Sequence, residues 1–288
     1  MTFAKRLRYR LEYAAFRLLQ AAILALPLEA ASRGSGRVWR LIAPHLYRQK
    51  RALDNLALAY PDMPLEERKK IANDMWENLG RTFAETFHLK KIMAEGRIRF
   101  EPQEQLDEMA RGGPCVVCGL HLGNWEFVAY AGKLMGAPFT GVYQRLSNPY
   151  VDAATLKLRE PLYEGGLLPK TPVTARTLLK KAKEGGYPAF LADLRDDRGA
   201  AVPFFGRPAL SSIFPALLAR TAGLPLYAGA AFRLPNVHFT IRAERVPIPQ
   251  TNDREADAVA ATAALQAQFE AFVREAPEQW MWGHRRWD

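Results

Sequence analysis

Residues 115–126, with the sequence CVVCGLHLGNWE, decide the fold. The run Cys115–Cys118 is apolar and β-branched at its centre, which is typical of a short buried strand. Gly119 and Gly123 permit turns that a side chain would hinder, and a helix is expected to follow through Leu134. A buried strand that leads through a glycine-containing turn into a helix indicates a layered α/β protein.

Apolar runs typical of strands alternate with segments whose apolar residues have helical spacing, on both sides of this stretch. An apolar residue recurs every four positions from Ile71 to Phe87, which predicts a long helix. Further strands are predicted at 138–143, 188–192, 224–232 and 238–246, and further helices at 174–183, 208–221 and 253–275. We therefore expect a layered mixed sheet flanked by helices. Ligands of such sheets gather where strands end, and His121, Arg145 and Asp193 all follow predicted strands.

Composition and charge divide the chain unevenly. It has 288 residues, a formal charge of +10 and two cysteines, too few for a disulfide scaffold and consistent with a reducing compartment. Residues 1–51 hold eleven lysines and arginines against two glutamates, so the rest is nearly neutral. Basic residues clustered beside an apolar stretch favour an anionic membrane over nucleic acid. We expect a basic N-terminal membrane-anchor region at 1–51 and one main domain at 52–288.

The apolar stretch is Tyr13–Leu28, which carries a single charge at Arg17. A helix of that length rises about 24 Å, less than the hydrocarbon core of a bilayer, about 30 Å. A membrane-associated helix that lies in the interface, or enters it at a tilt, is therefore at least as consistent as a span. Basic residues that continue at Arg33 and Arg37 argue against a cleaved export signal, and an ordinary amphipathic core helix remains the alternative.

His121 and Glu126 form the pattern that points to chemistry. In a regular helix their spacing separates them by about 140°, so we expect His121 on a turn and Glu126 in the first turns of the helix. An imidazole is a general base near neutral pH, and a carboxylate fixes its tautomer and stabilises the imidazolium. Cys115 and Cys118 lack a second cysteine pair, which disfavours a metal site, and a cysteine nucleophile is the weaker alternative.

The segment HLGNWE resembles the His-x4-Asp/Glu signature of the lipid A biosynthesis acyltransferase family, the lauroyl and myristoyl transferases. Further ordered segments similar to that family are ENLGR at 77–81, YQRLSNP at 143–149, VPFFG at 202–206 and PEQWMWGHRRW at 277–287. Leu194 departs from the Asp-Gln pair that family members commonly have, so any polar role of that glutamine is absent. The resemblance covers nearly the whole chain.

The resemblance implies transfer of a fatty acyl chain from an acyl carrier protein thioester to a hydroxyl of a glucosamine-based lipid A precursor. The reaction would take place at the cytoplasmic face of the inner membrane. The acyl carrier protein thioester is a co-substrate, and no cofactor or covalent acyl-enzyme is expected. His121 is assigned as the base and Glu126 as the carboxylate that orients it.

Six further residues are predicted to bind substrate. Arginine forks suit the phosphates of such an acceptor, so Arg145 and Arg159 come first, ahead of Arg285 and Arg286. Asp193 would pair with an arginine or organise the acceptor, a plain loop cap being the alternative. The set is completed by Asn124 within the motif and by Phe204 and Phe205, as lining of an acyl groove or as simple core.

Two other functions remain consistent with these residues. The same centre could acylate another membrane glycolipid or a glycerolipid, or draw on acyl-coenzyme A. A non-enzymatic protein that binds anionic membranes through its basic N-terminus belongs to a different class. Nucleic-acid binding is disfavoured because the body of the chain is nearly neutral.

Overall fold

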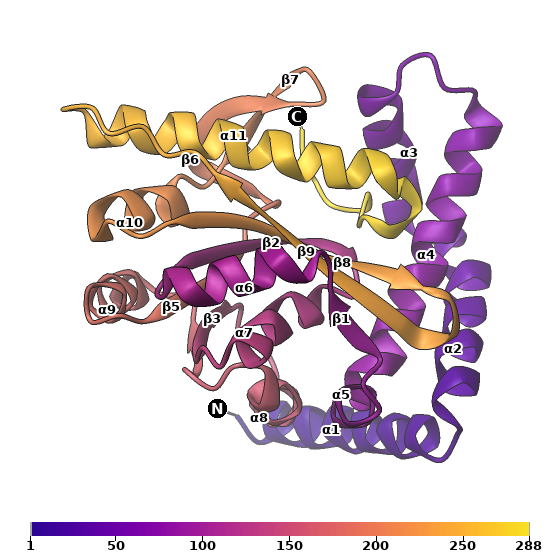
Figure 1. Ribbon diagram of the computed structural model, residues 1–288. Coiled ribbons are helices and arrows are strands. Elements are labelled where there is room, and N and C mark those ends of the chain that lie inside the picture. Colours follow the sequence, from indigo (N-terminus) through magenta and orange to yellow (C-terminus); the bar gives the residue numbers. More distant parts are fainter. Residues whose placement is uncertain (1, 288) are drawn as a thin grey trace.

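A seven-stranded sheet forms the centre of the structure, a computed structural model that describes residues 2–287 (Figure 1). The strand order is β1-β9-β8-β2-β5-β3-β4, and all neighbours are parallel except the pair β8 and β9. The strands are β1 (Ile98–Phe100), β2 (Val116–Gly123), β3 (Phe139–Tyr143), β4 (Leu167–Pro169), β5 (Tyr187–Leu191), β8 (Leu226–Leu234) and β9 (His238–Val246). The predicted mixed α/β sheet is confirmed.

Helices cover both faces of this sheet (Figure 1). They are α1 (Phe3–Leu24), α2 (Leu28–Ile42), α3 (Tyr47–Ala59), α4 (Leu65–Phe87), α5 (Leu89–Ala94), α6 (Gln103–Gly112), α7 (Tyr130–Met135), α8 (Pro149–Arg159), α9 (Pro172–Lys183), α10 (Phe214–Ala222) and α11 (Arg254–Glu275). Short 3₁₀ turns are η1 (Ala43–His45), η2 (Trp125–Ala129), η3 (Glu160–Leu162), η4 (Pro235–Val237) and η5 (Pro277–Gln279). Strand β2 is buried on both faces, since Val116 and Cys118 join the core on the α11 side and Val117 the other core.

Strand β2 is longer than predicted and contains His121 itself. Gly123, at its end, has φ of +58°, and a Cβ built there would lie 2.0 Å from the carbonyl oxygen of Ala231. Only glycine allows this approach to β8. The chain then enters η2 rather than a regular helix, and α7 follows only at Tyr130.

The segment 208–221 was predicted as one helix, and this is wrong. Its first residues form β7 (Arg207–Ser211), which pairs with β6 (Arg195–Phe204) in a separate two-stranded antiparallel sheet. Helix α10 begins only at Phe214, where Pro215 occupies its first turn. A proline is tolerated there because the first-turn amides have no partner within the helix.

Helix α2 packs onto the body of the protein through α4, whereas α1 also packs on α8. A Cβ on Gly80 of α4 would lie 2.7 Å from the carbonyl oxygen of Ser35, and one on Gly36 of α2 would lie 2.8 Å from Arg81 Cγ. Because both positions are glycine, α2 and α4 approach closely. Leu28, the end of the predicted anchor stretch, is buried at the start of α2. Across residues 2–287, no helix is both long enough and apolar enough to cross a membrane.

Candidate active site

Strands β2 and β5 bring His121 and Asp193 together at one edge of the sheet. The register pairs Gly119 of β2 with Leu191 of β5, so His121 and Asp193 each lie two residues beyond that pair. Nδ1 of His121 lies 2.8 Å from Oδ1 of Asp193, and the backbone amide of His121 donates to Oδ2 at 2.9 Å. Parallel neighbours end at the same edge, which is why residues 72 positions apart meet here.

Asp193 is fully buried, and three donors hold its carboxylate. Besides the two groups of His121, the indole Nε1 of Trp280 donates to Oδ2 at 2.9 Å. Burial alone would raise the pKa of Asp193, but the charge of His121 and hydrogen bonds from His121 and Trp280 together place it below its usual value. Asp193 is therefore a carboxylate at neutral pH and fixes the His121 tautomer with hydrogen on Nδ1.

With hydrogen on Nδ1, the second ring nitrogen of His121, Nε2, carries a lone pair that can accept a proton. The His121 side chain is 13% exposed, and two aromatic rings flank it. Trp125 of η2 lies 5.1 Å from it and His284 lies 5.5 Å from it, measured between ring centroids. An imidazole held by a buried aspartate and confined between rings is positioned as a general base.

Glu126 does not orient His121, contrary to the sequence prediction. It lies in η2, 4% exposed, and its Oε1 is 2.6 Å from Nη2 of Arg159 at the end of α8. The physical reason is that β2 continues through His121, so that Nδ1 faces the carboxylate supplied by β5. Asp193 takes the role that was predicted for Glu126. An arginine was predicted as the partner of Asp193, but the structure pairs Asp193 with His121.

Arg159, which was predicted to bind the acceptor, forms an ion pair with Glu126, and its acceptor contact stays a prediction. The charge of Glu126 raises the pKa of Arg159, and the Nε of this arginine is buried without a hydrogen-bond partner. Its side chain remains 29% exposed, so it borders both the buried glutamate and the surface. The ion pair joins η2, which directly follows the end of β2, to α8.

His284 is a neighbour of His121 that the sequence analysis did not single out. Burial, followed by the charge of His121, lowers the pKa of His284 to about 4, so it is neutral at neutral pH. Its Nε2 is buried without a hydrogen-bond partner. Asn55 of α3 donates from Nδ2 to the backbone oxygens of Trp282 at 2.7 Å and of His284 at 2.6 Å. Only the resemblance of the closing segment, WGHRRW, pointed to this part of the chain.

Asn124, directly after β2, is fully buried and contacts a polar network. Its Nδ2 donates to Oε2 of Glu85 at 2.9 Å, and the other oxygen of Glu85 accepts from Nη1 of Arg233 at 2.5 Å. Thr82 of α4 donates to the carbonyl oxygen of Gly123 at 2.9 Å. The predicted contact between Asn124 and substrate is therefore not available in this structure, and the network instead supports the turn after His121.

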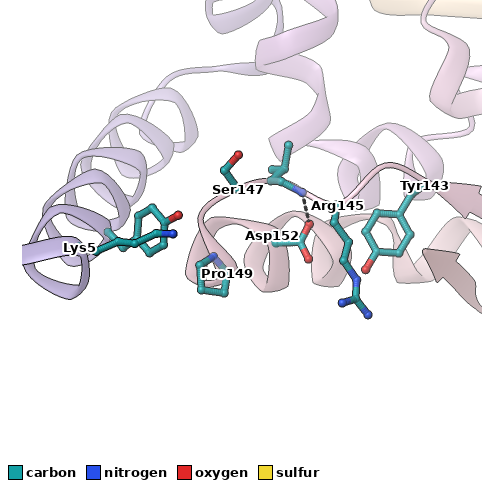
Figure 2. Close-up of a pocket in the computed structure, with 8 residues that line it drawn as sticks. Lys5, Tyr143, Arg145, Ser147, Pro149 and Asp152 are labelled. Carbon is teal, nitrogen blue, oxygen red and sulfur yellow. Dashed lines mark hydrogen bonds between the residues drawn. The ribbon is translucent and has the colours of Figure 1, made fainter. Parts of the chain in front are cut away.

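Arg145 lies apart from the His121 centre, in an open pocket of about 540 Å³ between α1 and the start of α8 (Figure 2). Figure 2 shows Lys5 of α1 on one side of this pocket and Arg145 on the other. Asp152 also lines it and accepts from the backbone amide of Leu146 at 2.8 Å. Among the described residues, neither Lys5 nor Arg145 has a carboxylate partner, so both cations remain available to an anion.

Phe204 and Phe205 belong to a buried aromatic cluster. They are 0% and 6% exposed and pack against Trp280, Trp282 and Trp287, so neither lines an open groove in this structure. The predicted acyl-groove role stays a prediction.

The two closing arginines differ in their surroundings. Arg286 is 1% exposed, and Nη1 donates to the backbone oxygen of Leu210 while Nη2 donates to Ser211 and Gln266. Arg286 therefore joins the C-terminal segment to β7 and α11 inside the core. Arg285 is exposed at the surface.

Both cysteines are free and buried, and burial raises the pKa of Cys115 to about 12 and that of Cys118 further. Thiols with such pKa values are poor nucleophiles. Across residues 2–287, no three metal-ligating side chains lie together.

A histidine fixed by a buried carboxylate at the carboxyl edge of an α/β sheet is an arrangement that can supply a general base. The family model of the bacterial lipid A biosynthesis acyltransferases matches residues 1–288. The chain is also 26% identical over 251 residues to the "Lipid A biosynthesis myristoyltransferase" of Escherichia coli (strain K12). The aligned region covers 81% of this chain and 73% of that protein. The "Lipid A biosynthesis acyltransferase 1" of Shigella flexneri matches with the same identity and coverage.

The chain therefore belongs to the bacterial lipid A biosynthesis acyltransferase family, as its HLGNWE motif predicted. It is a transferase that uses an acyl donor and a lipid acceptor.

Proposed function

We propose that this acyltransferase moves a fatty acyl chain from an acyl carrier protein thioester to a hydroxyl of a lipid A precursor. The observation that carries the proposal is the contact between Nδ1 of His121 and buried Asp193, which leaves Nε2 to act on a hydroxyl. The thioester carbonyl is already activated by its sulfur, so the reaction needs no cofactor beyond the carrier-bound substrate.

The proposed reaction is one displacement at the thioester carbon. His121 Nε2 takes the hydroxyl proton as the hydroxyl oxygen attacks, and Asp193 stabilises the imidazolium that forms. The tetrahedral intermediate collapses as the carbon–sulfur bond breaks, and the proton passes from Nε2 to the departing sulfur. An ester of the acceptor and a free carrier thiol result, with no acyl group on the enzyme.

Glu126 and Arg159 are assigned to the acceptor side of the centre. Arg159 is part exposed and adjoins η2, so it can donate to an acceptor oxygen while Glu126 holds its guanidinium in place. Glu126 then acts as a positioning residue for Arg159 rather than for His121. Its loss is expected to weaken acceptor use.

Phosphate groups of the acceptor are assigned to the pocket that Arg145 and Lys5 line. Two cations without carboxylate partners attract a phosphate more strongly than one does. Helix α8 connects this pocket with Arg159, and its length, about 15 Å, separates the phosphate contacts from the reacting hydroxyl.

The proposed location is the cytoplasmic face of the inner membrane, where both substrates would meet. Helix α1 supports it, because Phe3, Leu11 and Leu18 are exposed beside several arginines. Apolar side chains flanked by cations suit the surface of an anionic membrane.

Mass spectrometry of a reconstituted reaction tests the proposed function. The purified protein is mixed with a tetra-acylated, Kdo-bearing lipid A precursor and carrier protein loaded with acyl chains of several lengths. A product heavier by one acyl chain is expected, and it identifies the chain length. Parallel reactions with acyl-coenzyme A, or with phosphatidylglycerol as acceptor, test the alternative donor and acceptor. Absence of any acylated precursor with every donor would contradict the proposal.

A further inference from the structure

One exposed apolar surface lies outside the candidate active site, where α2 turns into α3. The inner face of α2 packs on α4, and its outer face presents Val38, Leu41 and Ile42, which are 52%, 72% and 56% exposed. These positions are spaced i, i+3 and i+4 and therefore share one face of the helix. Leu46 and Tyr47, which are 49% and 72% exposed, continue the surface into α3. We refer to residues 37–51 as the α2–α3 corner.

The stretch of sequence that carries this apolar surface is basic and has no acidic residue of its own. Between Glu29 and Asp54 the sequence has six arginines and lysines and no aspartate or glutamate. Arg40 and Lys50 are paired with carboxylates of α4 and α3. Among the described residues, Arg37, Arg48 and Arg51 have no carboxylate partner. The corner thus combines apolar side chains with uncompensated positive charge.

An anionic bilayer is the partner that this combination fits. Soluble proteins seldom expose contiguous leucine and isoleucine side chains without a partner. At a bilayer surface, such side chains enter the boundary between headgroups and acyl chains, while arginines remain at the phosphates. A nucleic acid would attract the arginines but would leave Leu41 and Ile42 in water.

Helix α3 links the corner to the candidate active site. The hydrogen bonds from Asn55 fix α3 to the segment that carries His284, whose ring lies 5.5 Å from that of His121. A membrane contact at the start of α3 would therefore hold His121 at a defined place relative to the lipid surface.

We infer that the α2–α3 corner inserts Val38, Leu41 and Ile42 into the surface of an anionic bilayer, as a membrane contact separate from α1. The inference rests on the proposed function in taking the bilayer as the place of reaction. The corner anchors the catalytic body itself, whereas α1 supplies a second contact.

An environment-sensitive dye at Leu41 tests the insertion directly. Cys115 and Cys118 are buried, so a maleimide dye labels a surface cysteine selectively in the variant Leu41→Cys. The matched control is Val173→Cys, a 69% exposed site on α9. Figure 1 shows helix α9 on the opposite side of the molecule from α2 and α3. With vesicles that contain phosphatidylglycerol, we expect a blue shift and a severalfold gain in fluorescence at Leu41 and no change at Val173. Vesicles of phosphatidylcholine alone should have little effect.

Two results would overturn the inference. One is an unchanged spectrum at Leu41 while the protein floats with the vesicles, because the corner would then stay in water. The other is a shift at Leu41 caused by acyl carrier protein without vesicles, which would assign the corner to a protein partner.

Charge insertion gives an independent measurement. The double substitution Leu41→Glu with Ile42→Glu should lower the apparent affinity for anionic vesicles about tenfold or more, whereas Val173→Glu should not. Unchanged affinity of the double variant would contradict the inference. Vesicle binding is measured without substrate, so a protein that binds as expected but transfers no acyl chain would refute the proposed function and leave the membrane contact standing.

Discussion

Asp193 stands two residues beyond Leu191, as His121 stands two residues beyond Gly119, and these two strand residues are paired across β2 and β5. This equal offset puts the carboxylate 2.8 Å from the imidazole. The side chain that fixes the base therefore comes from the neighbouring strand, and the Glu126 of the motif has a different partner.

Replacing Asp193 by Asn should lower kcat by about 10³–10⁴-fold, because an amide donates to Nδ1 and favours the wrong tautomer of His121. His121→Ala should cost a similar factor. Since the two residues act as a unit, the double variant should be little worse than either single variant. Single-turnover kinetics with carrier thioester would measure all three. Losses that multiply would show that the two side chains act independently.

Glu126→Gln should behave differently from Asp193→Asn. It leaves Arg159 partly buried without its counter-charge, so we expect a loss of about 1–3 kcal/mol in the free energy of unfolding, reduced by the partial exposure of Arg159. KM for the acceptor should rise, while slow hydrolysis of the thioester in the absence of acceptor should persist. Urea denaturation and the two kinetic assays would measure these effects.

The control is Lys69→Gln, which removes a partner from an exposed ion pair with Glu66 and should change the unfolding free energy by less than about 1 kcal/mol. If Glu126→Gln abolished thioester hydrolysis as fully as Asp193→Asn, Glu126 would belong to the proton-transfer machinery after all.

The sequence predicts features that depend on neighbouring residues, and it does not predict contacts between residues far apart in the chain. The strand before His121 and the approach of Asp193 to a strand end were both predictable from apolar runs. The order of strands was not, because β2 and β5 are separated in the chain by β3 and β4. For the same reason, no pattern among neighbouring residues predicts that Asp193 pairs with His121.

The misassigned segment at 208–221 and the missed residue His284 have related causes. The first was predicted to be helical despite Pro215, but its first residues pair with β6 in a hairpin. His284 reaches His121 only because the C-terminal segment returns to β2, where Leu122 bridges to Trp280. Tertiary pairing decided both cases, and it is not encoded in a window of neighbouring residues.

Gly123→Ala should be strongly destabilising and should impair catalysis. Its φ of +58° is unfavourable for alanine, and the added methyl would meet the carbonyl oxygen of Ala231. We expect a loss above about 3 kcal/mol in the free energy of unfolding, because β8 or the end of β2 must move. Urea denaturation and kcat would be measured together.

Gly96→Ala is the matched control for this substitution. Gly96 has φ of +64°, but nothing lies within 4 Å of a Cβ built there. Only the backbone cost of about 1 kcal/mol should appear, with normal activity. Equal losses for the two variants would show that the contact with Ala231 does not matter.

Acidification should weaken the fold through His284. Its pKa is lowered to about 4 in the folded protein, so the unfolded chain takes up the proton first as pH falls below about 6.5. Stability is therefore present above that pH and declines between about pH 6.5 and 4, and buried His88, whose pKa burial also lowers, adds to the decline. His284→Gln should flatten the dependence by about 1–3 kcal/mol over this range.

Urea denaturation at several pH values between 4 and 7 would measure the effect, with exposed His45→Gln as the control. A His284→Gln variant with the same pH dependence as the unmodified protein would show that His284 is not the group responsible.

Arg145→Ala should impair recognition of the phosphorylated acceptor without disturbing the His121 centre. The pocket that it shares with Lys5 lies at the far end of α8 from Arg159, so the loss should appear in KM for the acceptor, by about 10-fold or more, with little change in thioester hydrolysis without acceptor. Arg145→Lys should restore part of the loss, because a lysine keeps the charge but not the planar fork. Lys5→Ala should have a smaller effect in the same direction.

The matched control is Arg176→Ala. Arg176 is an exposed arginine on α9, and its replacement should leave KM for the acceptor unchanged. The decisive comparison uses a dephosphorylated acceptor: if Arg145 binds phosphate, the variant and the unmodified protein should use that acceptor equally well. A defect of the same size with both acceptors would remove phosphate recognition from this pocket.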